Sequence, residues 1–150
     1  MKSATKFFGS IFGIGFSPFF PGTLGSLFAC LVFIFFEPFH HPVLLSIFTF
    51  LLLIAGIWLG NLAEQFDEKD PCWFIVDEWV GQNIPLIILA STDYYFILLS
   101  FVMFRIFDIS KILKINNLQK YHGGTGIMLD DVLAGIYSLL IVGGVKWLLI

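Results

Sequence analysis

The clearest apolar run in this chain, Val43 to Gly60, reads VLLSIFTFLLLIAGIWLG and carries no charge. Such a run is typical of a helix that crosses a lipid bilayer, because roughly 20 apolar residues match the hydrocarbon thickness. The composition agrees, since 58% of the 150 residues are hydrophobic and only 13% are charged, whereas a soluble domain has about 25% charged residues. The sequence therefore predicts an integral membrane protein with a single domain over residues 1–150.

Further apolar runs predict the rest of the bundle. We expect spans over Thr23–Phe36, Trp79–Ala90, Tyr94–Phe104 and about Ile127 to the C-terminus. Thr23, the last residue of "PGT", is a candidate N-cap, and Pro85 predicts a kink in the third span. The predicted fold is all-α, a polytopic membrane helical bundle of about five spanning helices.

The first apolar run, Phe7 to Phe20, is a poor candidate for a straight helix because it contains three glycines and Pro18. Lys2 and Lys6 before it resemble the start of a signal peptide, but no small-residue cleavage site follows. We interpret this run as an N-terminal re-entrant or interfacial segment.

The distribution of basic residues predicts the orientation. With five spans and the N-terminus inside, seven of the eight Lys and Arg residues are cytoplasmic, and Lys146 alone lies near the outer face. We therefore expect a multi-pass membrane protein whose N-terminus and basic loops face the cytoplasm. The net charge of −3 gives no basic surface for nucleic acid, so no nucleic-acid partner is expected; the oligomeric state stays open.

Polar residues of chemically useful types gather at the cytoplasmic ends of these spans. The last span begins with Asp130 and Asp131, about 30 Å of helix from the C-terminus at ~1.5 Å per residue, which places both acids at the membrane surface. The others are Asp77 and Glu78 at the start of the third span, Arg105, Asp108 and Lys111 at the end of the fourth, and His122, Gly123 and Gly124 in the following loop.

This set of residues favours a metal and phosphate site. Carboxylates from several helices, without thiolates, are the ligands that suit Mg²⁺. Arg105 and Lys111 are suited to anionic phosphate, and backbone amides near Thr23, Gly123 and Gly124 are candidate donors to its oxygens. The expected partner is therefore a phospholipid substrate whose phosphate lies at headgroup level. The predicted metal ligands are Asp77, Glu78, Asp108, Asp130 and Asp131.

Simpler interpretations exist for each residue. Acids at helix starts often only favour the helix dipole, Arg105 is also suited to anchoring a span, and the charge run from Glu64 to Asp70 is most simply a solvated loop. Three other functions also stay open: a small transporter or channel with an acidic ion site, a phosphoalcohol transferase, and a structural subunit. A transporter or channel predicts ionisable groups spread through the bilayer depth. A phosphoalcohol transferase is expected to carry an array of Asp-Gly and Ala-Arg motifs, which this sequence lacks.

Four blocks resemble, in order, the signature blocks of the phosphatidylglycerophosphatase A family. They are SPFFPGTLGSL (Ser17–Leu27), VDEWVG (Val76–Gly81), FRIFDISK (Phe104–Lys111) and HGGTGIMLDDVLAGI (His122–Ile136). The resemblance covers residues about 7 to 140, and the last block is the most specific.

The resemblance implies an Mg²⁺-dependent membrane phosphatase that converts phosphatidylglycerophosphate to phosphatidylglycerol. It also implies a location in a bacterial inner (cytoplasmic) membrane, with the active site facing the cytoplasm. Carried over by motif, it places Asp77, Glu78, Arg105, Asp108, Lys111, His122, Asp130 and Asp131 in the site. His122 is a candidate acid for the leaving group. The family's prolines after the lysine are missing here, which leaves the position of Lys111 in question. Two questions stay open: whether an Asp is a covalent nucleophile or only a metal ligand, and whether the substrate is another lipid phosphate.

Overall fold

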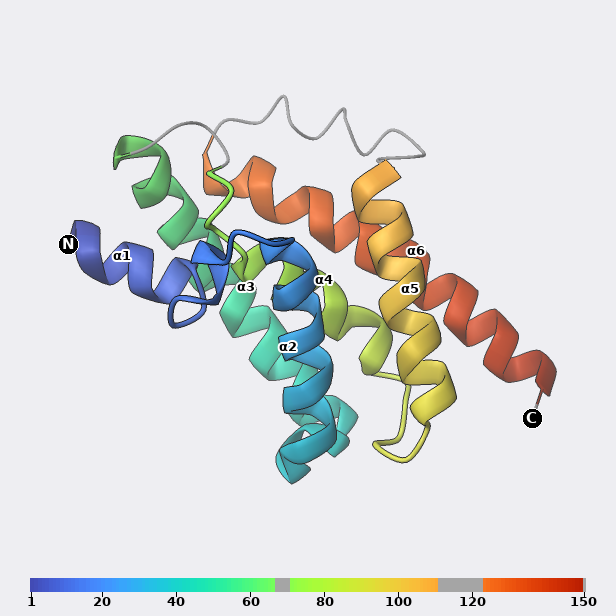
Figure 1. Ribbon diagram of the computed structural model, residues 1–150. Coiled ribbons are helices and arrows are strands. Elements are labelled where there is room, and N and C mark those ends of the chain that lie inside the picture. The colour runs from blue at the N-terminus through green and yellow to red at the C-terminus, as the bar shows by residue number, and fades with distance from the viewer. Residues whose placement is uncertain (67–70, 111–122, 150) are drawn as a thin grey trace.

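The computed structural model describes residues 1–66, 71–110 and 123–149, and these residues form a helical bundle (Figure 1). In chain order the elements are α1 (Lys2–Gly9), the 3₁₀ helix η1 (Ile14–Phe16), α2 (Pro21–Phe35), the 3₁₀ helix η2 (Glu37–His40), α3 (Pro42–Phe66), α4 (Val76–Leu86), α5 (Tyr94–Ser110) and α6 (Gly124–Leu149). No strand occurs among the described residues. The predicted all-α class is confirmed.

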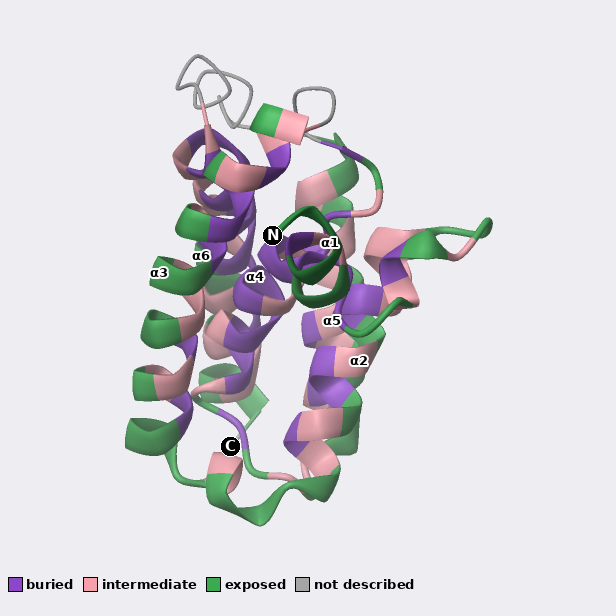
Figure 2. Ribbon diagram, turned by 90° about the vertical axis from the view of Figure 1, so that its left-hand side faces the viewer, coloured by how far each residue is buried: buried purple, intermediate pink, exposed green. Residues whose placement is uncertain are grey.

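Helix α4 lies inside the bundle and packs against α2, α3, α5 and α6. Figure 2 shows that most of its surface is buried. Two polar contacts help to hold this centre together: Gln82 Nε2 of α4 donates to Ser100 Oγ of α5 at 3.1 Å, and Ser138 Oγ of α6 donates to the Ser100 carbonyl at 3.1 Å. Among the described helices, the 11-residue α4 is therefore the one that α2, α3, α5 and α6 surround.

The prediction of a span from Trp79 to Ala90 is wrong, because the helix found there is shorter than a span. Helix α4 ends at Leu86, directly after Pro85, and has 11 residues, which measure about 16 Å at ~1.5 Å per residue. Proline lacks the backbone N–H and its ring clashes with the preceding turn. Pro85 therefore lies in the last turn of a short buried helix and does not kink a longer one.

Two helices of the described residues, α3 and α6, are long and apolar enough to cross a membrane, and α2 is a shorter apolar helix. The expected run from Val43 to Gly60 lies entirely within α3. The prediction of about five spanning helices is not confirmed, because α4, at 11 residues, is far shorter than the ~20 residues of a typical span.

The N-terminal segment is not a single helix, as the glycines in it predicted. After α1 the chain turns sharply at Ile11 and Phe12, whose φ angles are 49° and 58°, and then enters η1. The turn is fixed to the segment before α4, since the Ile75 amide donates to the Gly9 carbonyl at 2.9 Å. Whether this segment lies at a membrane interface stays a prediction.

Helix α2 begins two residues earlier than expected. Pro21 is its first residue, and Phe20, with φ 47°, is at the N-cap position without a side-chain cap. Proline is favoured at the first helical position because its φ is preset and its missing N–H is not needed there. The prediction that Thr23 is the N-cap is therefore wrong, because Thr23 lies within the first turn of the helix.

Helices α4 and α6 approach closely at two glycines. A Cβ on Gly81 would lie 2.6 Å from the Asp131 carbonyl oxygen and 2.5 Å from the Phe104 ring, and a Cβ on Gly135 would overlap the Gly81 carbonyl. Without side chains at these positions the two helix backbones can touch. This contact brings the first turns of α6 beside the first turn of α4.

Gly81→Ala is expected to lower the midpoint of thermal unfolding and the turnover rate together, because overpacking a tight contact typically costs about 1–3 kcal/mol. The matched control is Gly144→Ala in α6, where a Cβ would meet nothing within 4 Å. Alanine is the better helix former by about 1 kcal/mol, so the control is expected to unfold at or above the wild-type midpoint. Intrinsic fluorescence during heating measures the unfolding midpoint of each variant. Equal shifts of the midpoint with the same sign in Gly81→Ala and Gly144→Ala would contradict the close approach of the two helices.

Candidate active site

A pocket of about 460 Å³ opens at the end of the bundle where α2, α4 and α6 begin and α5 ends. Seven of the predicted site residues line it. They are Thr23, Asp77, Glu78, Arg105, Asp108, Asp130 and Asp131. Residues that are more than 100 positions apart in the sequence thus line one pocket. This agrees with the prediction that they gather at the same end of the spans.

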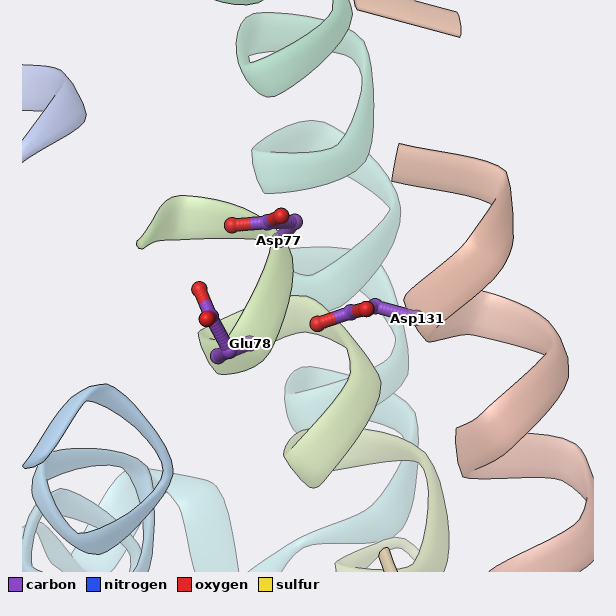
Figure 3. Close-up of side chains that lie close together, drawn as sticks. All are labelled: Asp77, Glu78 and Asp131. Carbon is purple, nitrogen blue, oxygen red and sulfur yellow. The ribbon is translucent and has the colours of Figure 1, made fainter. Parts of the chain in front are cut away.

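Three of the carboxylates that line the pocket lie close together (Figure 3). One oxygen from each of Asp77, Glu78 and Asp131 lies within 4.8 Å of the other two. Asp77 and Glu78 come from the first turn of α4, and Asp131 comes from α6, so the group depends on the close approach of these two helices.

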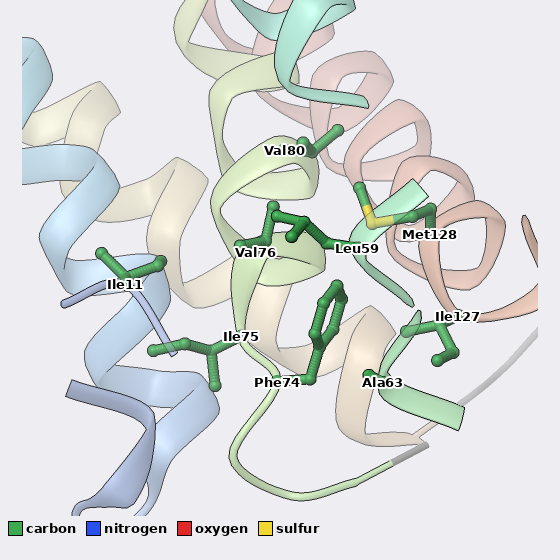
Figure 4. Close-up of a cluster of buried hydrophobic side chains, with 9 residues drawn as sticks. All are labelled: Ile11, Leu59, Ala63, Phe74, Ile75, Val76, Val80, Ile127 and Met128. Carbon is green, nitrogen blue, oxygen red and sulfur yellow. The ribbon is translucent and has the colours of Figure 1, made fainter. Parts of the chain in front are cut away.

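A buried apolar cluster fixes the backbone that precedes these acids (Figure 4). Phe74, Ile75 and Val76 are each at most 2% exposed and lead directly into Asp77, and Met128 is fully buried one turn before Asp131. Because these side chains are packed in the interior, the acids that follow them have little freedom to turn away. At the start of α4 the helix dipole also favours the two negative charges.

The three acids lie in an environment that disfavours their combined charge. Oε2 of Glu78 and Oδ2 of Asp131 are buried and have no hydrogen-bond partner among the described residues. Burial raises the pKa of the Glu78 carboxyl above its usual value, and the charge of Asp108 raises it further, whereas hydrogen bonding with Asp77 and the charge of Arg105 lower it. A cation at this position would relieve the repulsion.

Among the described residues, Arg105 is the cation that lines the pocket. Its Nη1 lies 2.7 Å from Asp108 Oδ2 and donates to Ser26 Oγ at 3.4 Å, while its Nε is buried without a partner among the described residues. Ser26 Oγ in turn donates to the Gly22 carbonyl at 3.0 Å. The guanidinium is therefore held in place on one side and keeps donor capacity for an anion.

Gly22 lets these charged groups meet the first turn of α2. A Cβ at this position would overlap Glu78 Oε1 and lie 3.3 Å from Arg105 Nη2. Backbone N–H groups in a first helical turn lack intrahelical partners and favour anions. The pocket thus combines a carboxylate group, an arginine and a helix N-terminus, which is an arrangement suited to a phosphate with a divalent cation.

The residues present fit Mg²⁺. The close group is made of oxygen donors only, which this hard cation prefers, and two of its oxygens have no other partner. With Mg–O bonds of about 2.1 Å, adjacent ligand oxygens of an octahedral ion lie about 3.0 Å apart and opposite ones about 4.2 Å apart, so the three oxygens, now within 4.8 Å of one another, would move closer together around the ion. Asp108, paired with Arg105, and the buried Asp130 line the same pocket outside this group. The grouping is thus narrower than the five predicted ligands.

The comparison with known proteins agrees with this geometry. A family model described as phosphatidylglycerophosphatase A matches residues 7–146. This chain belongs to the phosphatidylglycerophosphatase A family. The predicted family is confirmed, and with it the prediction of a phosphatase that hydrolyses a phosphomonoester.

Three relatives extend the comparison. A protein of Bacteroides thetaiotaomicron provisionally named phosphatidylinositol-3-phosphatase is 41% identical, covering 94% of this chain and 92% of the relative. Phosphatidylglycerophosphatase A of Escherichia coli is 36% identical over 85% of this chain and 74% of its own. The protein of the same name from Haemophilus influenzae is 34% identical over 86% and 81%. No solved structure matches the chain.

In this member of the phosphatidylglycerophosphatase A family, Gly123 and Gly124 do not contribute to the pocket, contrary to the predicted phosphate contacts. The Gly123 amide donates to Glu64 Oε2 at 3.0 Å, and the Gly124 amide donates to Asn61 Oδ1 at 2.8 Å. These amides donate to side chains of α3 and so fix the start of α6 against that helix. The interpretation of Glu64 as part of a solvated loop is therefore wrong. Glu64 is a partly buried residue of α3.

Two predicted residues, Lys111 and His122, lie outside the described residues, and their roles stay predictions. The sequence reasoning missed two contacts. No role was assigned to Ser26 or to Asn61 from the sequence. The single amide of Asn61, directly after the long apolar run of α3, is the kind of signal that indicates a specific polar contact.

Proposed function

We propose that this chain is an Mg²⁺-dependent lipid phosphatase that hydrolyses phosphatidylglycerophosphate to phosphatidylglycerol and inorganic phosphate. The observation that carries the proposal is the group of Asp77, Glu78 and Asp131 oxygens within 4.8 Å, in one pocket with Arg105. Acids collected at one end also argue against an ion path, which needs them through the bilayer depth.

The roles of the side chains follow from their charge and placement. Asp77, Glu78 and Asp131 would hold Mg²⁺, with Asp108 and Asp130 at the edge of the group. Arg105 binds and neutralises phosphoryl oxygens through a fork that Asp108 and Ser26 orient. The first-turn amides of α2 near Thr23 add hydrogen bonds to the same oxygens. Positioning and charge stabilisation of this kind provide most of the rate in phosphoryl transfer.

Mg²⁺, when bound, supplies Lewis-acid stabilisation of the charge that develops on the phosphoryl oxygens. Lys111 would add a second positive charge, and His122 would give a proton to the leaving alkoxide.

A location in a bacterial inner membrane, with the pocket on the cytoplasmic side, is part of the proposal. The two long apolar helices α3 and α6 support it, and α3 carries exposed apolar side chains along its length, including Leu44, Ile47, Leu51, Ile54 and Trp58. Seven of eight basic residues then lie inside. Acyl chains in the bilayer would hold the substrate phosphate at the level of the pocket.

A second candidate is a phosphatase of phosphatidylinositol 3-phosphate, which the name of the Bacteroides thetaiotaomicron relative favours. Both lipids present a phosphomonoester at the membrane surface. They differ in the group that carries it, glycerol in one and the bulkier inositol ring in the other, so the same acids and Arg105 would serve both.

Phosphate release from purified protein in mixed micelles tests the proposal. We expect the highest kcat/KM on phosphatidylglycerophosphate, lower values on phosphatidylinositol 3-phosphate and phosphatidic acid, and a value at least roughly 100-fold lower on soluble glycerol 3-phosphate, because the micelle raises the effective concentration of the lipid. Preference for the inositol lipid would favour the second candidate. Equal efficiency on glycerol 3-phosphate would contradict a lipid phosphatase.

A further inference from the structure

An apolar groove of about 470 Å³ runs along α5 beside the first turn of α2. Its walls include Phe101, Val102 and Ile106, and the last two are 40% and 45% exposed. From Phe101 to the end of α5 at Ser110 the groove spans roughly 13 Å at ~1.5 Å per residue. The groove therefore extends from the end of α5 that bears the acidic pocket towards the middle of that helix.

This groove is continuous with the candidate active site. Thr23, Arg105 and Ile109 line both the groove and the acidic pocket. A molecule whose phosphate reaches Arg105 from the pocket side can therefore extend into the groove without crossing the protein interior. The polar end and the apolar end of this combined surface match the two ends of a phospholipid.

Two other apolar grooves of the described residues lack this connection. One, of about 510 Å³, lies between η1 and α2, and another, of about 340 Å³, lies between the N-terminal segment and α3. Neither shares a lining residue with the acidic pocket. Because the acyl chains of a phospholipid are covalently tied to its headgroup, only a groove that opens into the pocket can hold them during the reaction.

We propose that the groove between α5 and the start of α2 binds an acyl chain of the lipid substrate, which enters the site sideways between these two helices. The proposal rests on the proposed lipid phosphatase function and adds the place and direction of substrate entry. Arg105 lies where groove and pocket meet, so the phosphate contacts its guanidinium while the chain packs on Val102 and Ile106. Apolar contact of this kind contributes binding in proportion to the area covered.

The test compares the same headgroup on long and short chains. Phosphatidylglycerophosphate with two oleoyl chains and with two six-carbon chains is supplied to the full-length protein in mixed micelles. Val102→Trp fills the groove and is expected to lower the ratio of kcat/KM for the long-chain to the short-chain lipid roughly 10-fold. The matched control is Leu98→Trp, one turn earlier on α5, where Leu98 is 62% exposed and outside the groove; it should keep the wild-type ratio.

Ile106→Trp serves as a second variant if Val102→Trp fails to insert, and the same fall in the ratio is expected. An unchanged ratio in a folded groove variant, or the same fall in Leu98→Trp, would overturn the proposed groove. A change in oligomeric state on light scattering, with the ratio unchanged, would assign the groove to a second copy of the chain and also overturn it. A wild-type protein that hydrolyses neither lipid would instead contradict the proposed function itself.

Discussion

Replacing Asp131 by asparagine is expected to lower kcat at least about 100-fold, equivalent to roughly 2.7 kcal/mol of transition-state stabilisation. Asparagine keeps the shape of the side chain but removes a charged oxygen from the Asp77, Glu78 and Asp131 group, and Mg²⁺ depends on such oxygens. The protein should still fold, because the change removes a negative charge that faces Glu78 and Asp108. Phosphate release at saturating lipid and Mg²⁺ measures the effect.

A second measurement separates lost metal binding from lost folding. A cation that binds only the folded state raises its stability, so Mg²⁺ should raise the wild-type unfolding midpoint and EDTA should reverse the shift. Asp131→Asn should abolish the shift without lowering the midpoint in EDTA. The control is Asp93→Asn, which removes an acid paired at 2.7 Å with Lys146 away from the pocket and should keep both turnover and the Mg²⁺ shift. Full wild-type activity in EDTA would disprove the metal assignment.

Replacing Arg105 by lysine is expected to lower kcat/KM roughly 100-fold although the positive charge is kept. An ammonium group cannot reproduce the planar fork that contacts Asp108 and Ser26 on one side and offers donors to the phosphate on the other. Steady-state kinetics in mixed micelles measure the loss. Activity within a few-fold of wild type would show that charge alone suffices at this position.

Inhibition by inorganic phosphate distinguishes the roles of the two residues. Arg105→Lys should weaken this inhibition and keep the Mg²⁺-induced rise in the unfolding midpoint, because its contacts are to the anion. Asp131→Asn should lose the Mg²⁺ effect. If both variants lost both effects equally, the pocket would be acting as a single structural unit and the separate roles would be wrong.

The pattern of apolar runs and the signature blocks predicted much of this protein correctly. The run from Val43 to Gly60 predicted the core of α3, and the glycines and proline between Phe7 and Phe20 predicted that no straight helix forms there. The acids at the starts of α4 and α6 were assigned to one end of the bundle from the predicted spans and the distribution of basic residues. These features are local, since they depend on hydropathy and backbone preferences within one segment.

The extent of α4 and the fate of the glycine amides were not predictable in this way. The sequence from Trp79 to Ala90 is apolar enough for a span, yet the helix stops after Pro85 and is enclosed by its neighbours. The amides of Gly123 and Gly124 looked available for phosphate, but Asn61 and Glu64 on α3 accept their hydrogen bonds. Both outcomes depend on segments that are distant in the sequence.

The sequence by itself determined the helical class, the family and the residue types that supply the chemistry. Only the tertiary structure decided that Asp77, Glu78 and Asp131 form the closest group, with Asp108 turned to Arg105. The physical reason is that side chains on different helices meet only where the helix backbones come close. Here that distance is set by the contact of α4 and α6 at Gly81 and Gly135, and no pattern within either helix encodes its partner.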